Sequence, residues 1–299
     1  GRLLQKLPEF DYAARKIRQD WVSVYEYGNT LGPPNYMKNI EEEYSSLIQK
    51  SETFFRALSV GTEKRLKKQF QGENLDLDAA IDASISVRTN NHPEQNFYQD
   101  RSKPMRSLAI HLLLDTSEST RTKVPNSRKS IIDLEKDSAA ILAKALDKIN
   151  DPFAITGFCS NGRHDVKVQS IKKFTENFGI MNAMSLAGLS SGYSTRLGAA
   201  LRHCSFSFDK MHAHRKLILL VTDGYPSDID VDDVNYLAMD TKQAVVYLKE
   251  LQIDVFCVAL GKNSAERAEK IFGKSRCIVI NNLTTLPSKL ATLYVKLTS

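Results

Sequence analysis

The stretch that decides the fold is HLLLDTSEST, residues 111–120, in which three leucines run directly into side chains that all carry oxygen. A continuous apolar run, unlike an alternating one, predicts a strand buried on both faces, as in a parallel sheet. Such a strand ends at the carboxyl edge of the sheet, where open α/β folds bind their ligands. We therefore expect Asp115, Ser117 and Ser119 to lie at a ligand-binding edge.

Apolar runs alternate with helical patterns on both sides of this stretch. Strands are predicted at 107–114, 153–159, 166–171, 216–222, 253–260 and 277–280. Helices are predicted at 131–149, 196–208, 241–251 and 285–297. The third of these helices is expected to begin at Asp240, because Gln243 follows at the spacing of a capping box. The alternation predicts the α/β class, with a doubly wound, mainly parallel sheet covered by helices on both faces.

The chain before residue 105 has a different pattern. Apolar residues at helical spacing predict helices at 11–27, 39–58 and 75–87, and the polar stretch 88–104 is typical of a connector. The resulting division is a helical segment with its connector over 1–104 and an α/β domain over 105–299. Trp21 is expected to pack the helical segment onto the α/β domain.

The composition excludes several classes of function. The 299 residues carry a net charge of +6, which comes entirely from residues 105–299, but no basic run with interleaved aromatic residues predicts nucleic-acid binding. No apolar run reaches the length of a membrane span, and the first residues do not form a signal peptide. The four cysteines are widely spaced and mostly lie in apolar segments, which predicts buried free thiols and a cytoplasmic location.

Three polar loops carry the candidate ligands: DTSES (115–119), GLSSGYSTRLG (188–198) and TDGYPSD (222–228). Because loops at one edge of a doubly wound sheet converge, five side chains are expected to surround one point: Asp115, Ser117, Ser119, Thr195 and Asp223. Two carboxylates and three hydroxyls, without imidazole or thiolate, suit Mg²⁺, with Mn²⁺ or Ca²⁺ as alternatives. Since Mg²⁺ requires six ligands, an Asp or Glu of a partner protein would complete the site.

DTSES resembles the Asp-x-Ser-x-Ser signature of the metal-ion-dependent adhesion site of von Willebrand factor A domains. The resemblance implies that Ser117 and Ser119 contact the metal directly and that Asp115 acts directly or through water. It also implies that Thr195 joins when an acidic ligand binds, and that Asp223 is the remaining carboxylate. Next to the metal, Arg196, Gly224 and Tyr225 are expected at the partner-binding surface, although Arg196 is equally well explained as the first exposed residue of its helix.

A wider resemblance covers almost the whole chain, including the region before residue 105. LPEFD (7–11), ENLDLDAAIDASISVR (73–88), DPFAITGFCSNGRHDV (151–166) and FGKSRCIVI (272–280) are similar to the C-terminal part of NorD/CbbO proteins. That family works with a hexameric MoxR-type AAA+ ATPase. NorD is an activation protein for nitric oxide reductase, and CbbO is the adaptor subunit of a Rubisco activase. Family members are longer, so Gly1 is expected to be an internal cut.

The resemblance implies a non-catalytic adaptor that binds an acidic residue of a target protein through Mg²⁺ and couples the target to the ATPase. We favour Rubisco as the target, because a soluble target suits a cytosolic adaptor. The alternatives are a NorD-like role with nitric oxide reductase and a metal-dependent binding module that works without an ATPase.

An enzyme is the main alternative from another class. Asp115 beside Mg²⁺ could act as a phosphoryl-transfer nucleophile, but Ser117 stands where such enzymes commonly place a second acid. The chain also lacks a phosphate-binding GxxxxGK[ST] run, and Ser117 does not lie in a G-x-S-x-G motif. Purely structural roles are expected for His111, as a hydrogen-bonded core residue, and for the acidic stretch 227–233, as a solvated loop.

Overall fold

The computed structural model describes residues 1–59, 64–69, 74–75, 81, 98–102, 108–124, 128–213, 215–223, 225–260 and 264–280, and the single positions 282, 285 and 289. The chain divides into two compact units. The first contains Gly1–Arg56 and Ser107–Ser299, and the second contains Ala57–Arg106. The second unit has an antiparallel sheet in the order β3-β5-β4. Its strands are β3 (Lys64–Gln69), β4 (Asn74–Leu75) and β5 (Tyr98–Ser102).

The first unit is built on an eight-stranded sheet in the order β1-β2-β8-β7-β6-β9-β10-β11. The strands are β1 (Arg2–Asp11), β2 (Lys16–Glu26), β6 (Leu108–Asp115), β7 (Phe153–Ser160), β8 (Val166–Lys172), β9 (Arg215–Thr222), β10 (Ile253–Leu260) and β11 (Cys277–Ile280). Neighbouring strands are parallel except in the pairs β1–β2 and β7–β8. The mainly parallel α/β sheet predicted from the sequence is confirmed.

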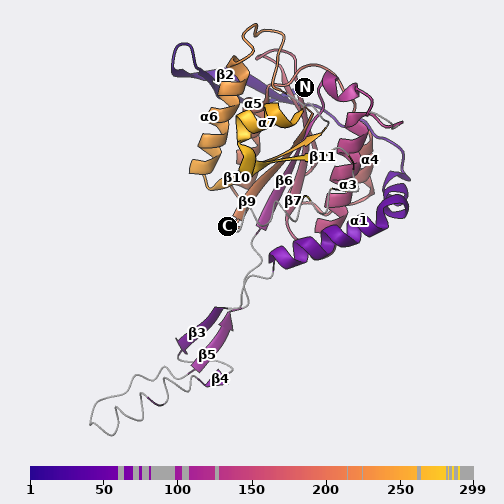
Figure 1. Ribbon diagram of the computed structural model, residues 1–299, viewed down its shortest axis with the longest axis vertical. Helices are drawn as coiled ribbons and strands as arrows, with labels where there is room; N and C mark the ends of the chain where they lie inside the picture. The colour runs from indigo at the N-terminus through magenta and orange to yellow at the C-terminus, as the bar shows by residue number, and fades with distance from the viewer. Residues whose placement is uncertain are drawn as a thin grey trace, which may run out of the picture. The chain divides into compact units, whose positions relative to one another are not determined.

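Helices cover both faces of this sheet (Figure 1). They are α1 (Tyr36–Ser59), α3 (Ile131–Ile149), α4 (Ile180–Ala187), α5 (Leu197–Ser205), α6 (Tyr236–Glu250) and α7 (Ser264–Phe272). Short 3₁₀ turns lie at Glu118–Arg121, Phe206–Phe208 and Lys274–Arg276. Helices α3 and α4 lie on one side of the sheet and α5, α6 and α7 on the other, with α1 running along the outside of α3. The ion pair of Lys144 with Glu41, at 2.7 Å, joins α1 to α3.

The central strands are mainly apolar because neither of their faces meets water. Every residue of β7 is buried, and β6 is buried from Ala109 to Asp115. Strand β6 lies between β7 and β9, so the chain leaves it first toward one edge of the sheet and later returns on its other side. The carboxyl ends of β6 and β9 therefore flank the topological switch point, where ligands of doubly wound sheets bind.

The helix predicted at 11–27 is wrong, because this region is a β-hairpin. Strands β1 and β2 pair antiparallel, and β2 adds parallel to β8 through Val24 and Val166. Leu7, Val22 and Val24 are buried in the main core. The hairpin thus extends the α/β sheet, and residues 1–56 belong to the same unit as 107–299. This differs from the expected helical segment over 1–104.

The remaining predicted elements have mixed outcomes. Helix α1 agrees with the prediction at 39–58, whereas the helices predicted at 75–87 and 285–297 lie almost entirely outside the described residues. The sequence analysis missed α4 and α7. The expected helix start at Asp240 is wrong, since α6 begins at Tyr236 and Asp240 lies fully buried within it.

Candidate functional site

The five predicted ligands come together at the carboxyl edge of the sheet. Asp115 is the last residue of β6 and Asp223 directly follows β9, while Thr195 lies just before α5. Because β6 and β9 are hydrogen-bonded parallel neighbours, their two carboxylates emerge at the same edge. Asp115, Ser117 and Thr195 are buried at 0%, 2% and 4% exposure, so the floor of this site is closed.

A chain of hydrogen bonds joins the five side chains. Ser119 Oγ donates to Asp223 Oδ1 at 2.8 Å and lies 3.0 Å from Ser117 Oγ. Asp115 Oδ1 accepts from the backbone N–H of Ser117 at 3.0 Å and lies 3.5 Å from Thr195 Oγ1. All five residues thus share one polar cluster that faces the end of the sheet.

Backbone hydrogen bonds hold the loops of the cluster in place. The N–H of Thr195 donates to the carbonyl of Ser227 at 2.8 Å, and the reverse bond is 3.1 Å long. The N–H of Glu118 donates to the carbonyl of Tyr193 at 2.9 Å, which ties the DTSES loop to the loop before α5. Tyr193 adopts a positive φ of 67°, which helps to turn the chain here. These backbone contacts hold the DTSES loop, the loop before α5 and the segment around Ser227 against one another.

The electrostatics of the cluster favour the binding of a cation. Burial and the nearby charge of Asp223 raise the pKa of Asp115 to about 6, and burial also raises the pKa of Asp223. In the described part of the chain, neither carboxylate forms an ion pair with a Lys or Arg. Two acids held together without a counter-charge are stabilised when a cation joins them.

The donor set fits a hard divalent cation. Among the residues described, no group of three or more His, Cys, Asp or Glu side chains is arranged to hold a metal ion. A cation here would thus be held by Asp115, Asp223 and the hydroxyls of Ser117, Ser119 and Thr195. An all-oxygen set of this kind suits Mg²⁺ and leaves room for water or for a carboxylate from another protein.

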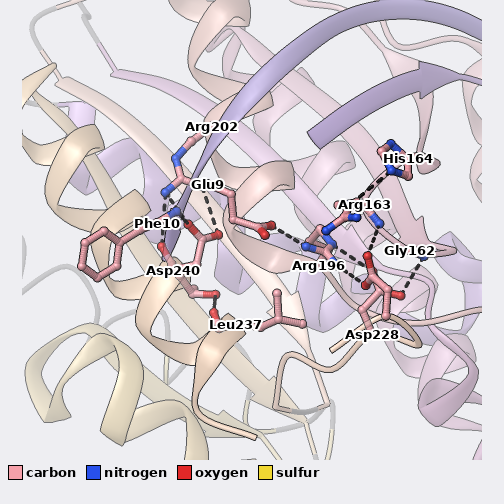
Figure 2. A network of polar contacts seen from close by, with 12 residues as sticks. Glu9, Phe10, Gly162, Arg163, His164, Arg196, Arg202, Asp228, Leu237 and Asp240 are labelled. Carbon is pink, nitrogen blue, oxygen red and sulfur yellow. Dashed lines mark hydrogen bonds and ion pairs between the residues drawn. The ribbon is translucent and has the colours of Figure 1, made fainter. Parts of the chain in front are cut away.

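The structure contradicts the predicted role of Arg196 at the partner-binding surface. Its side chain is only 1% exposed and is ion-paired with Glu9, so it does not lie at the surface. Figure 2 shows its guanidinium between the carboxylates of Glu9 and Asp228. Arg196 Nε donates to Asp228 Oδ2 at 3.0 Å, and a further ion pair joins Arg196 to Asp230. Arg196 is therefore a buried structural cation, because these acids neutralise it.

The stretch 227–233 is mostly exposed, as predicted for a solvated loop, and Asp228 is the buried exception. Its carboxylate is buried and accepts the N–H of Gly162 at 2.9 Å as well as the Arg196 bond. Of the other residues expected to contact a partner, Tyr225 is half-buried and packs against the main core. Gly224 lies outside the described residues.

Two residues of the site were missed by sequence reasoning. Thr222 Oγ1 donates to Asp115 Oδ2 at 2.6 Å and so orients the central carboxylate. Glu135 of α3 is fully buried, and the charges of Asp115 and Asp223 act on it. Thr222 could have been found in the motif TDG, but nothing in the sequence marks Glu135, which lies in a helix 20 residues after Asp115.

The predictions for His111 and the cysteines are confirmed. His111 is 3% exposed, and its ring nitrogens lie 2.8 Å from Ser207 Oγ and 2.9 Å from Thr156 Oγ1. Burial lowers the pKa of His111 to about 3, so the ring is neutral at physiological pH. All four cysteines are buried, and none of them forms a disulfide in the described part of the chain.

This fold and site define a class of protein. The sequence matches the von Willebrand factor type A domain family over residues 109–290, and the chain belongs to that family. The fold is similar to that of the PilB minor pilin from Streptococcus sanguinis, with 16% identity, a TM-score of 0.49, and coverage of 67% of this chain and 64% of the pilin.

Two relatives match well beyond the family domain. The chain is 32% identical over 292 residues to an uncharacterised protein of Pseudomonas aeruginosa. This match covers 98% of this chain and 47% of the relative. The chain is 30% identical over 268 residues to Protein NorD of Stutzerimonas stutzeri, covering 90% of this chain and 43% of NorD. The resemblance to the NorD type is thereby confirmed, and the chain spans less than half the length of these relatives. In the described residues, no helix is long and apolar enough to cross a membrane.

Proposed function

We propose that this chain is a non-catalytic adaptor that binds an acidic side chain of a target protein through Mg²⁺. The observation that carries the proposal is the convergence of Asp115, Asp223 and three hydroxyls on one point, with no neighbouring Lys or Arg paired to either carboxylate in the described part of the chain. Mg²⁺ supplies the charge and the open coordination position that an external carboxylate requires.

The residues of the chain hold and orient this site without taking part in a reaction. Thr222 and the backbone N–H of Ser117 fix the two oxygens of Asp115, and Ser119 fixes Asp223. The buried floor excludes bulk water, so an incoming carboxylate meets the cation in a region of low dielectric, where the attraction is stronger than in water. We propose that any ATP chemistry belongs to a MoxR-type hexameric AAA+ partner.

Two target proteins follow from the resemblance, and the relatives favour one of them. The cytosolic location expected for the chain favours Rubisco, but several curated relatives carry the name NorD, including those of Stutzerimonas stutzeri and Brucella suis. We therefore propose nitric oxide reductase as the first target to test and Rubisco as the second.

The experiment is binding of this chain to each purified target by interferometry, in Mg²⁺ and then in EDTA. Binding to one target that EDTA abolishes supports the proposal and identifies the target. Binding that is unchanged by EDTA contradicts a metal-dependent mechanism. Co-purification of the chain with a hexameric ATPase distinguishes the adaptor from a binding module that works alone.

A further inference from the structure

Glu135 is a buried acid for which the described residues supply no hydrogen-bond partner. It lies in the second turn of α3 and is 1% exposed. Neither of its carboxyl oxygens has a hydrogen-bond partner among the described residues. Buried polar groups are almost always hydrogen-bonded, and an orphaned one calls for an explanation such as a bound ion or water.

The two other acids at the start of α3 show how unusual this is. Asp133 accepts from the N–H of Ser130 at 3.0 Å and caps the helix. Asp137 accepts from Lys129 Nζ at 2.8 Å and from Tyr36 Oη at 2.9 Å. Both acids have an ordinary structural role, and Glu135 has none.

The location of Glu135 links it to the candidate metal site. Helix α3 packs against β6 and the 3₁₀ turn Glu118–Arg121, which directly follows Ser117 and contains Ser119. The N–H of Ile131 donates to the carbonyl of Thr122 at 2.9 Å and fixes the start of α3 beside the same loop. Burial, and then the negative charges of Asp115 and Asp223, raise the pKa of Glu135 well above its usual range. Three carboxyl groups thus share one buried region without a paired Lys or Arg in the described chain.

The three carboxyl groups do not form a direct set of ligands in the described structure. A cation held by Asp115 and Asp223 would bring its own water, because Mg²⁺ usually keeps several of its water molecules. Water bound to a cation is a strong hydrogen-bond donor, and Glu135 offers two unused acceptors.

We propose that Glu135 is a positioning residue of the cation site, whose carboxylate accepts hydrogen bonds from the water carried by the bound cation. This inference rests on the proposed metal-dependent function. It assigns to the site a third carboxylate that lies outside the Asp-x-Ser-x-Ser, Thr and Asp set.

The test compares Glu135→Gln with the unchanged chain by calorimetric titration with Mg²⁺ and by thermal melting with and without Mg²⁺. Glutamine keeps the volume of the side chain but removes its charge. Since removal of an outer hydrogen-bond partner of a metal typically weakens metal binding about 10- to 100-fold, the Mg²⁺ affinity of Glu135→Gln should fall by this factor. The metal-free variant should melt at the same or a higher temperature, because a buried unpaired carboxyl group has been removed.

The matched control is Asp137→Asn, two residues along the same helix with the same change of charge. It should lower the metal-free melting temperature, since it removes the charge that pairs with Lys129 and one of the two oxygens that accept from Lys129 and Tyr36, and leave the Mg²⁺ affinity within about twofold. Unchanged affinity in Glu135→Gln, or an equal loss in Asp137→Asn, would overturn the inference. If the unchanged chain fails to bind Mg²⁺, the proposed function fails as well; if it binds and only the Glu135 effect is missing, the proposed function stands.

Discussion

The buried guanidinium of Arg196 is ion-paired with the buried carboxylate of Glu9, a residue of the first strand that lies 187 positions earlier in the chain. Arg196 directly follows Thr195, one of the five candidate ligands. The pair therefore ties the loop that carries Thr195 to the hairpin of β1 and β2, and Asp228 ties it to the loop that follows Asp223 (Figure 2). Through these contacts the hairpin helps to fix the geometry of the site.

Replacing Arg196 should be costly. Arg196→Met leaves Glu9 and Asp228 buried without their cation, and breaking a buried ion pair by removing one partner typically costs about 3–5 kcal/mol. We expect the free energy of unfolding, measured in urea, to fall by roughly this amount. Arg2→Met is the control, because the pair of Arg2 with Glu26 is largely exposed and exposed pairs contribute little. Equal stability of the two variants would contradict a structural role for the Arg196 network.

Asp115→Asn should abolish Mg²⁺ binding and Mg²⁺-dependent target binding without unfolding the protein. The asparagine keeps an oxygen to accept one of the hydrogen bonds that Asp115 now receives from Thr222 and Ser117, but it removes the charge that holds the cation. Interferometry and circular dichroism measure the two effects. Asp209→Asn, an exposed acid beyond α5, should bind as the unchanged chain does; loss of binding there as well would point to a general charge effect.

Stability and Mg²⁺ binding should respond to pH in opposite directions. Because the pKa of Asp115 is raised to about 6 in the folded protein, the metal-free fold binds more protons than the unfolded chain between the usual pKa of Asp and this value. The metal-free melting temperature should therefore fall as the pH rises through this window.

Mg²⁺ reverses this trend, because it binds the ionised carboxylate. The increase in melting temperature on adding Mg²⁺ should be small near pH 5 and large above pH 7. Melting curves in EDTA and in Mg²⁺ across this range measure both effects. A Mg²⁺-induced increase that does not change with pH would exclude Asp115 as a ligand.

Gly198 and Gly192 offer a matched pair of substitutions near the site. A Cβ on Gly198 would lie 2.0 Å from Asp240 Oδ2, within the buried ion pair of Asp240 with Arg202. A Cβ on Gly192 meets nothing within 4 Å. We expect Gly198→Ala to lower the free energy of unfolding by about 1–3 kcal/mol, as overpacking does, and Gly192→Ala to change it by less than about 0.5 kcal/mol. Urea unfolding of both variants measures the difference.

The main sheet could be predicted because its strands are buried on both faces. Runs such as LLL in β6 and LILLV in β9 would present no polar face to water either as a surface helix or as a half-exposed strand, so they predict strands buried on both faces. The metal-site residues could be predicted for a related reason. They directly follow such strands, so the topology brings them together once the strands are parallel neighbours.

The hairpin could not be predicted from the sequence, because its apolar residues fit both the period of a helix and the period of a strand. Ile17, Trp21 and Val24 are spaced as on one face of a helix, but in the structure Val22 and Val24 point into the core while Ile17 is 58% exposed. Trp21 packs partly against the core, as expected, and it lies beneath two arginines, with the guanidinium carbons of Arg18 and Arg163 at 4.7 and 4.4 Å from its ring centroid. Pairing of Val24 with Val166 of β8, which lies 142 positions later in the chain, decides the conformation, and local periodicity carries no information about it.

The burial of Arg196 could not be predicted for the same reason, because it depends on residues that are distant in the sequence. A cation at the start of a helix beside a metal loop is typical of an exposed, ligand-steering residue. Its burial depends on Glu9 and Asp228, and no local signal shows that either acid reaches it.

The hairpin has a consequence for how this domain can be cut or transplanted. The family domain spans 109–290, yet the sheet and the partner of Arg196 require residues 2–26. A recombinant fragment that starts at the family boundary would open the edge of β8 and leave Arg196 without Glu9. The exchangeable module is therefore discontinuous in sequence: it joins Gly1–Arg56 to Ser107–Ser299, and a transplanted domain has to carry both parts.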